Sequence, residues 1–169
     1  MFFSSTRLNY FEIVPADQAD YMSMVMNAVV MKYITYHALT ADDARLRFNK
    51  VIETNSRYPD LGYYSVRLKE GNAFLGVVKL IYATSDQAEV GYMLKPEYWG
   101  RHFASEMVNR TIEYARTIER IKELIAVVDP ENAASIQVLK KCNFYLFKTE
   151  PIDNLPADFY KLDLDCNRE

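Results

Sequence analysis

A strand that leads through a short turn into a helix is the part of this chain best suited to hold a ligand. The stretch runs from Ala88 to Glu106. Its turn contains Trp99, Gly100, Arg101, His102, Phe103 and Ala104. The first amides of a helix have no partner within the helix and lie at the positive end of its dipole. The turn therefore favours an anionic ligand such as a phosphate, although His102 stands where a glycine would fit more comfortably.

The strand before this turn aims a carboxylate at one face of a sheet. Alternation places Glu89 on the same face as Met93 and opposite to Val90. If that face lines a cleft beneath the turn, Glu89 could accept a proton from a substrate, directly or through water. The alternative is that Glu89 lies at a strand start that faces solvent.

Two polar residues share one face of a later helix. Asn132, Ser135, Leu139 and Cys142 recur at three- and four-residue steps, so polar and apolar side chains alternate on that face. The polar pair could contact a ligand. Equally, Asn132 could cap the helix and Ser135 could bond to a backbone carbonyl one turn back.

Other kinds of catalytic centre are not indicated. The two histidines, His37 and His102, lie far apart without a carboxylate partner at fixed spacing, so the sequence predicts no metal site. The chain has no Gly-x-Ser-x-Gly elbow, no Gly-x-Gly-x-x-Gly run and no Walker Gly-Lys-Ser/Thr. Cys142 and Cys166 are too few for a disulfide framework, which fits a reducing compartment.

The composition is that of an ordinary globular domain. The 169 residues are 50% hydrophobic and 25% charged, and they are expected to form one domain over 1–169. A net charge of −3 argues against non-specific binding to nucleic acid. No basic leader and no run of ~18 apolar residues is present. We therefore expect a cytoplasmic protein without a membrane or nucleic-acid partner.

A sheet and several helices must position the candidate residues. Alternating residues predict strands over 6–14, 63–68, 73–82, 87–94, 123–128, 144–148 and 159–164. Apolar spacing and capping residues predict helices over 16–31, between Thr40 and Pro59, over 103–118 and from Asn132 onward. Four methionines in the first helix predict core packing, with a substrate pocket as the alternative. This order of elements predicts a mixed sheet with helices on its faces, an α/β (α+β) fold.

With these motifs, almost the whole chain resembles the GNAT superfamily of acetyl-CoA-dependent N-acetyltransferases, and within it the RimJ/RimL-like branch. Two motifs carry the resemblance in the right order and spacing, Glu89 to Glu106 and Asn132 to Phe144. Ser5 to Leu8, Met31 to Ile34 and Leu39 to Ala44 are similar to the opening segments of that branch. The resemblance implies a single GNAT domain, with a central, mostly antiparallel sheet of about seven strands flanked by about four helices.

The resemblance also implies acetyl-CoA as cosubstrate and no metal. The pyrophosphate would lie on the amides of Trp99, Gly100, Arg101, His102, Phe103, Ala104 and Ser105. The pantetheine arm would follow the strand at Met93 and Leu94, with Asn132 and Lys141 as further contacts.

The implied reaction is attack of a neutral amine on the acetyl thioester, with Glu89 as base and an N–H near Leu94 steadying the thioester oxygen. Many relatives protonate the leaving thiolate with a tyrosine where this chain has Leu139. Ser135 is the next best donor, unless the thiolate needs none. The acceptor would be a protein N-terminus or a small amine, and a homodimer is left open.

Two glycines of the family pattern are replaced in this chain. Asn143 replaces a glycine but tolerates a left-handed backbone. His102 replaces the central glycine of the phosphate turn, where it would cost about 1 kcal/mol at positive φ or else bond to a phosphate. His102 and the missing tyrosine leave an alternative function: a catalytically impaired relative that binds CoA as a sensor, or an interaction protein.

Overall fold

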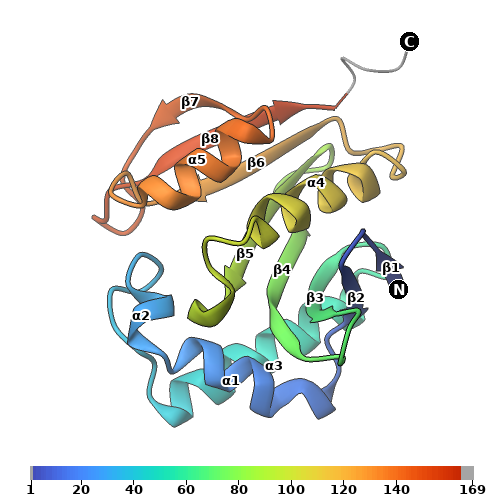
Figure 1. Cartoon of the computed structure of the whole chain (residues 1–169). Coiled ribbons are helices and arrows are strands. Elements are labelled where there is room, and N and C mark those ends of the chain that lie inside the picture. Colours follow the sequence, from blue (N-terminus) through green and yellow to red (C-terminus); the bar gives the residue numbers. More distant parts are fainter. Residues whose placement is uncertain (1, 165–169) are drawn as a thin grey trace.

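The computed structural model describes residues 2–164, which form one eight-stranded sheet with helices on both faces (Figure 1). The strands are β1 (Phe2–Ser4), β2 (Leu8–Glu12), β3 (Gly62–Leu68), β4 (Phe74–Tyr82), β5 (Gln87–Leu94), β6 (Glu123–Val128), β7 (Tyr145–Thr149) and β8 (Asp158–Asp163). The helices are α1 (Gln18–Val25), α2 (Ala28–Met31), α3 (Ala41–Arg57), α4 (Phe103–Ala115) and α5 (Ala133–Lys141). Two short 3₁₀ turns are η1 (Pro15–Asp17) and η2 (Pro96–Tyr98). Cys166 lies outside the described residues.

The sheet changes direction at one pair of strands. Its order is β1-β2-β3-β4-β5-β6-β8-β7, and every neighbouring pair is antiparallel except β5 and β6. These two run parallel and pair only where Gln87–Glu89 meets Glu123–Ile125. Beyond Glu89 no described strand pairs with this edge of β5. The sheet is therefore open between the ends of β5 and β6.

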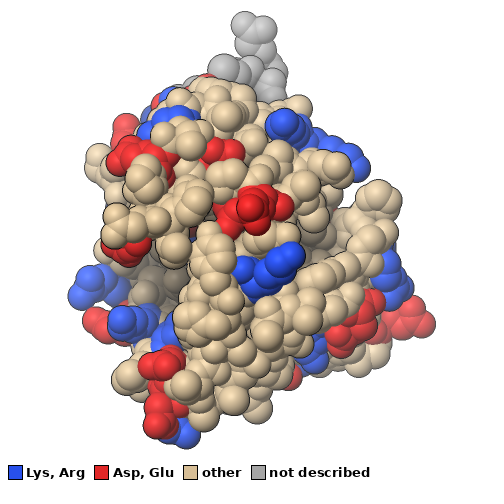
Figure 2. All heavy atoms as spheres, turned by 90° about the vertical axis from the view of Figure 1, so that its left-hand side faces the viewer, with Lys and Arg blue, Asp and Glu red and all other residues tan. Residues whose placement is uncertain are grey.

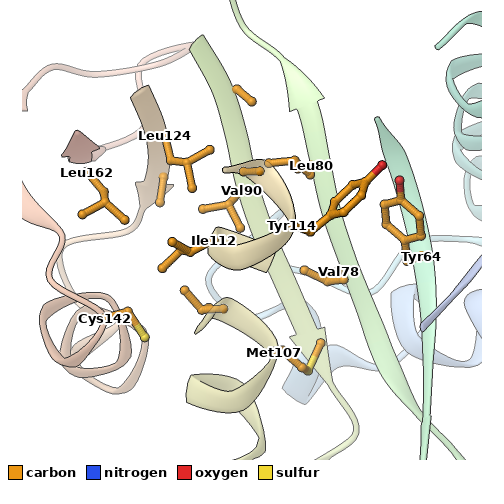
Figure 3. Packing of buried hydrophobic residues seen from close by; sticks show 14 of the residues in the cluster. Tyr64, Val78, Leu80, Val90, Met107, Ile112, Tyr114, Leu124, Cys142 and Leu162 are labelled. Atoms are coloured by element: carbon orange, nitrogen blue, oxygen red, sulfur yellow. The ribbon is translucent and has the colours of Figure 1, made fainter. Parts of the chain in front are cut away.

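Helices α4 and α5 cover one face of the sheet. Met107 and Ile112 of α4 pack against Val90 of β5, together with Val78 of β4 and Leu124 of β6 (Figure 3). All five residues are 5% exposed or less. This core fixes the start of α4, and hence the turn before it, against β5.

Helices α1, α2 and α3 cover the opposite face. Met24 and Met31 are fully buried beside Phe48 of α3, and Val77 of β4 belongs to the same cluster. The predicted core role is confirmed for these two methionines and wrong for Met26, which is 42% exposed. Met93 of β5 packs against this cluster, so the two faces of β5 belong to two separate cores.

A buried amide fixes the end of α3 to the sheet. Asn55 donates through Nδ2 to the carbonyls of Ile13 at 3.1 Å and Tyr63 at 3.0 Å, and its Oδ1 accepts from the Tyr63 amide at 2.7 Å. Gly62 makes room for it, since a Cβ there would lie 2.4 Å from Asn55 Oδ1. The orientation of α3 over the sheet therefore follows from these bonds.

The predicted fold class is confirmed, with corrections in number and bounds. The sheet has eight strands instead of about seven, because β1 (Phe2–Ser4) was missed. Five helices flank it instead of about four. The helix predicted over 16–31 is two helices. Asn27 separates them, because its side chain accepts from the Val29 amide at 2.9 Å and caps α2. The predicted strand over 6–14 covers only Leu8–Glu12, and α4 ends at Ala115 instead of residue 118.

Candidate active site

A cavity of about 1060 Å³ lies where β5 and β6 separate. Its lining includes Glu89 and Met93 from one face of β5, and Tyr92 and Leu94 from the other. The cavity therefore passes around the open edge of β5 and joins the two faces of the sheet. All of the predicted site residues except Arg101 line it.

The turn before α4 has the backbone that a phosphate site requires. Gly100 has φ 71° and His102 has φ 63°, so both are left-handed. Within residues 2–164, no acceptor is found for the N–H groups of residues 100–105, which come directly before or open α4. These amides lie at the positive end of the helix. The turn therefore fits an anion.

Glu106 holds this turn in place and is not free for a ligand. Its carboxylate accepts from the Ser5 hydroxyl, the Arg7 amide and Arg7 Nε, each at 2.7 Å. Burial alone would raise the pKa of Glu106, but these hydrogen bonds outweigh it and lower that pKa below its ordinary value. Arg7 also donates to the Arg101 carbonyl at 3.2 Å and covers the Phe103 ring at 4.1 Å. The segment before β2 thus anchors the turn.

The end of β5 is shaped by two close contacts. A Cβ at Gly76 would lie 2.1 Å from the Met93 carbonyl oxygen, so glycine is what allows this approach of β5 to β4. The Trp99 indole donates to the Leu94 carbonyl at 2.9 Å and ties the turn back to the strand. Met93 and Leu94 are therefore held in fixed positions at the cavity edge.

Glu89 lies at the cavity in an ion pair. Lys79 Nζ is 2.6 Å from Glu89 Oε1, and the two side chains are about equally exposed, at 27% and 25%. Lys79 is opposite Gly91 in the β4–β5 register, and a Cβ at Gly91 would lie 2.6 Å from the lysine side chain. Sequence reasoning missed Lys79, although alternation along β4 places it on the face that Glu89 shares.

Ser135 is hydrogen-bonded to a tyrosine that sequence reasoning also missed. The Tyr92 hydroxyl lies 2.7 Å from Ser135 Oγ and donates to the Ser135 carbonyl at 3.2 Å. Burial raises the pKa of Tyr92, so its phenol keeps its proton at neutral pH. Asn132 Oδ1 accepts from the Ser135 amide at 3.1 Å, so the capping alternative is confirmed for Asn132. Leu139, which follows Ser135 on the same face of α5, is buried in the core with 1% of its surface exposed.

The remaining predicted contacts lie at the end of α5 and after it. Lys141 is in the last turn of α5 and lines the cavity. Asn143 has φ 66°, and the amide of Phe144 bonds to the Leu139 carbonyl at 3.0 Å, which closes the helix in a Schellman motif. The left-handed backbone expected at Asn143 is confirmed.

The α2–α3 connection closes the cavity on its other side. The Tyr36 hydroxyl donates to Asp129 Oδ2, just beyond the end of β6. Tyr33 and Tyr63 also line the cavity. Figure 2 looks onto this side of the molecule, where basic and acidic side chains gather around a hollowed surface.

The arrangement can bring together two ligands from opposite faces of the sheet. The free amides before α4 suit an anionic ligand on one face, and the Lys79–Glu89 pair suits proton transfer on the other. Their meeting point is the open edge of β5 near Leu94. Over residues 2–164, no group of three or more His, Cys, Asp and Glu residues could hold a metal ion. Within the same range no helix is long and apolar enough to cross a membrane.

The chain matches one family model and several proteins of the same kind. The model described as "Acetyltransferase (GNAT) domain" matches residues 7–145. The uncharacterized N-acetyltransferase p20 of Bacillus licheniformis is 35% identical over 48% of this chain and 47% of its own length. The uncharacterized N-acetyltransferase YnaD of Bacillus subtilis is 30% identical over 66% of this chain and 64% of its own length. The matches thus span about half to two thirds of these relatives.

Solved structures share the fold over nearly the whole chain. A GNAT-family acetyltransferase from Bacillus anthracis superimposes with a TM-score of 0.83 at 23% identity, covering 98% of this chain and 99% of that one. The ribosomal L7/L12 α-N-protein acetyltransferase RimL, in complex with CoA, superimposes with a TM-score of 0.82 at 15% identity. That match covers 99% of this chain and 100% of RimL. Spermidine N-acetyltransferase from Vibrio cholerae, in complex with CoA and spermine, superimposes with a TM-score of 0.78 at 20% identity. That match covers 94% of this chain and 96% of the Vibrio chain.

The left-handed backbone of His102 predicts a stability effect. His102→Gly should raise the free energy of unfolding by about 1 kcal/mol, because glycine adopts positive φ without a Cβ clash. The matched control is Asn143→Gly, with φ 66° in the original residue; it should gain less, because asparagine tolerates this backbone. Urea unfolding of the three proteins measures both differences. An equal gain at the two positions would contradict strain at His102.

Proposed function

Because the chain belongs to the acetyltransferase (GNAT) domain family, we propose that it transfers the acetyl group of acetyl-CoA to a primary amine. One observation carries the proposal: a single cavity joins the unpaired amides before α4 to the Lys79–Glu89 pair, through the open edge of β5. The acceptor is a protein N-terminus or a small amine. We also assign the chain to the RimJ/RimL-like branch on its sequence motifs.

Acetyl-CoA would occupy the α4–α5 side of the cavity. The amides of residues 100–105 would hold its pyrophosphate, and Lys141 would add a positive charge. The Trp99 amide, predicted as a further contact, is engaged instead with the Pro96 carbonyl at 3.1 Å. Asn132 Oδ1 accepts from the Ser135 amide and caps α5, so its Nδ2 would be the atom that donates to the pantetheine arm. The pantetheine would run beside Met93 and Leu94, where β5 has no described strand partner on this side. When bound, acetyl-CoA supplies a thioester carbonyl that an amine can attack.

Glu89 is the proposed base. An α-amine titrates near ~8 and a lysine-type amine near ~10.4, so either must lose a proton before it attacks at neutral pH. The amine nitrogen forms a bond to the thioester carbon, the carbon–sulfur bond breaks, and the amine proton passes to Glu89. Lys79, 2.6 Å from that carboxylate, keeps it oriented toward the cavity.

The Ser135–Tyr92 pair is the proposed acid. As the carbon–sulfur bond breaks, the sulfur takes a proton from the Ser135 hydroxyl, which regains one from the Tyr92 phenol 2.7 Å away. This pair replaces the tyrosine that many relatives carry at the position of Leu139. Burial raises the pKa of the Tyr92 phenol, which holds its proton until the sulfur needs one, and the phenolate left by the relay regains a proton from solvent as the products leave.

An alternative function is a CoA-binding protein without transferase activity. Two features favour it: the left-handed His102 in the phosphate turn, and the ion pair that engages Glu89. The unpaired amides of the turn are present in either case, so an activity measurement separates the two functions.

Titration with acetyl-CoA tests the proposal. Acetyl-CoA at 100 times its dissociation constant should raise the free energy of unfolding by about 2.7 kcal/mol. Free thiol should appear when acetyl-CoA is mixed with a panel of peptides and small amines. Absence of stabilisation would overturn both CoA functions, whereas stabilisation without thiol release would favour the sensor. His102→Ala in the same titration should weaken affinity if the imidazole bonds to a phosphate.

Removal of the proposed base should slow acetylation in a pH-dependent way. We expect Glu89→Gln to lower kcat about 100-fold at pH 7, the scale of general-base catalysis. The deficit should shrink as the pH rises past the pKa of the acceptor amine, because the amine then reacts without help. Glu70→Gln, at an exposed turn residue, is the control and should match the wild type. A deficit that is constant from pH 6 to 10 would remove Glu89 as the base.

Removal of the proposed acid should show non-additive effects. Tyr92→Phe and Ser135→Ala should each lower kcat about tenfold, and the double variant should cost no more than the larger single one, because the two hydroxyls act in one relay. The KM for acetyl-CoA should change little. Tyr98→Phe, at another cavity tyrosine, is the control. Additive losses would show that the hydroxyls act independently.

A further inference from the structure

Arg47 of α3 projects a positive charge into the acceptor side of the cavity without a carboxylate partner. It lines the cavity and is partly buried. Among residues 2–164, no Asp or Glu oxygen forms a salt bridge with it. Lys79 in the same half of the cavity differs, because Glu89 neutralises it. Arg47 is therefore the guanidinium whose counter-charge the cavity itself does not supply.

The acidic groups on α3 and along the cavity do not pair with Arg47. Asp43, one helical turn before Arg47, accepts from the Thr40 hydroxyl at 2.7 Å and forms no salt bridge among the described residues. Glu89 pairs with Lys79. Asp129 accepts from the Tyr36 hydroxyl and, at 2.7 Å, from the Glu131 amide. Asp153 belongs to the turn after β7 and forms no salt bridge among the described residues. The charge of Arg47 thus remains available to a ligand.

The neighbours of Arg47 place it on the same side of the sheet as Glu89. Burial raises the pKa of the Tyr21 and Tyr63 hydroxyls, and Arg47 lies close enough to both to oppose that shift. Tyr63 is opposite Lys79 in the β3–β4 register, and Lys79 is opposite Gly91. Tyr63 thus lies two strands from β5, about 10 Å across the sheet. The bonds of Asn55 keep α3, and with it Arg47, over this row.

A guanidinium in a partly buried site is most favourable with a carboxylate, which can accept two parallel hydrogen bonds from it. A second cation would instead meet repulsion there. We propose that the acceptor is a primary amine that also carries a carboxylate, which Arg47 binds while the amine lies beside Glu89. The spacing of the two groups favours an acceptor with several bonds between amine and carboxylate. This inference rests on the proposed function and excludes a polyamine as the preferred acceptor.

Matched acceptors test the inference. Each pair keeps the amine and removes only the charge: 6-aminohexanoate against its amide, and the C-terminally amidated dipeptides Ala-Asp and Ala-Asn. Spermidine and the diamine cadaverine serve as polycationic acceptors, called polyamines below. Thiol release from acetyl-CoA gives kcat/KM for each. For at least one pair we expect the carboxylate member to exceed its amide at least tenfold and to exceed both polyamines.

Variants of α3 locate the effect. Arg47→Gln should reduce the ratio within that pair to about one, and should leave the affinity for acetyl-CoA unchanged. Arg47→Lys keeps the charge and should retain part of the preference. Arg45→Gln, an exposed neighbour on the same helix that pairs with Asp42, is the control and should keep the full ratio. Thermal unfolding of each variant verifies that it folds.

The outcomes separate this inference from the function on which it rests. Turnover with equal rates for acid and amide in both pairs, or best with a polyamine, would overturn the inference and leave the transferase function standing. A preference that survives in Arg47→Gln would overturn the role of Arg47. Stabilisation by acetyl-CoA without thiol release from any acceptor would overturn the transferase function and this inference together.

Discussion

The short parallel pairing of β5 and β6 is the constraint on which the site depends. Hydrogen bonds join these strands only from Gln87 to Glu89, and beyond that point the edge of β5 is open. A fully paired sheet would separate the helices of its two faces, whereas this one connects them through a cavity. The two cores therefore do more than stabilise the fold. They hold the phosphate-type turn and the carboxylate on opposite faces, with one opening between them.

The turn before α4 combines a strained backbone with a strong anchor. A left-handed histidine costs free energy that a glycine would not, and yet the turn is held by Glu106, Arg7 and Trp99. Such anchoring is what lets a strained turn persist in one conformation. The amides that remain unpaired are then oriented before any ligand arrives, so little ordering is left for binding.

Sequence predicted the parts of the site that follow from local rules, and it missed those that follow from contacts between distant segments. The turn, the helix cap at Asn132 and the face of Glu89 come from capping preferences and strand alternation, which short windows reveal. The pairing of Lys79 with Glu89 depends on the β4–β5 register, and the contact of Tyr92 with Ser135 depends on how α5 packs. Strand β1 was missed because only three residues pair.

Gly91 shows how a residue without a side chain governs the charge of the site. It takes no part in proton transfer, but the space above it is where Lys79 lies on its way to Glu89. A Cβ there would lie 2.6 Å from Lys79 Cε, so any larger residue would force the lysine side chain to shift. A substitution at position 91 could therefore alter the geometry of the Lys79–Glu89 pair while both charged residues remained unchanged.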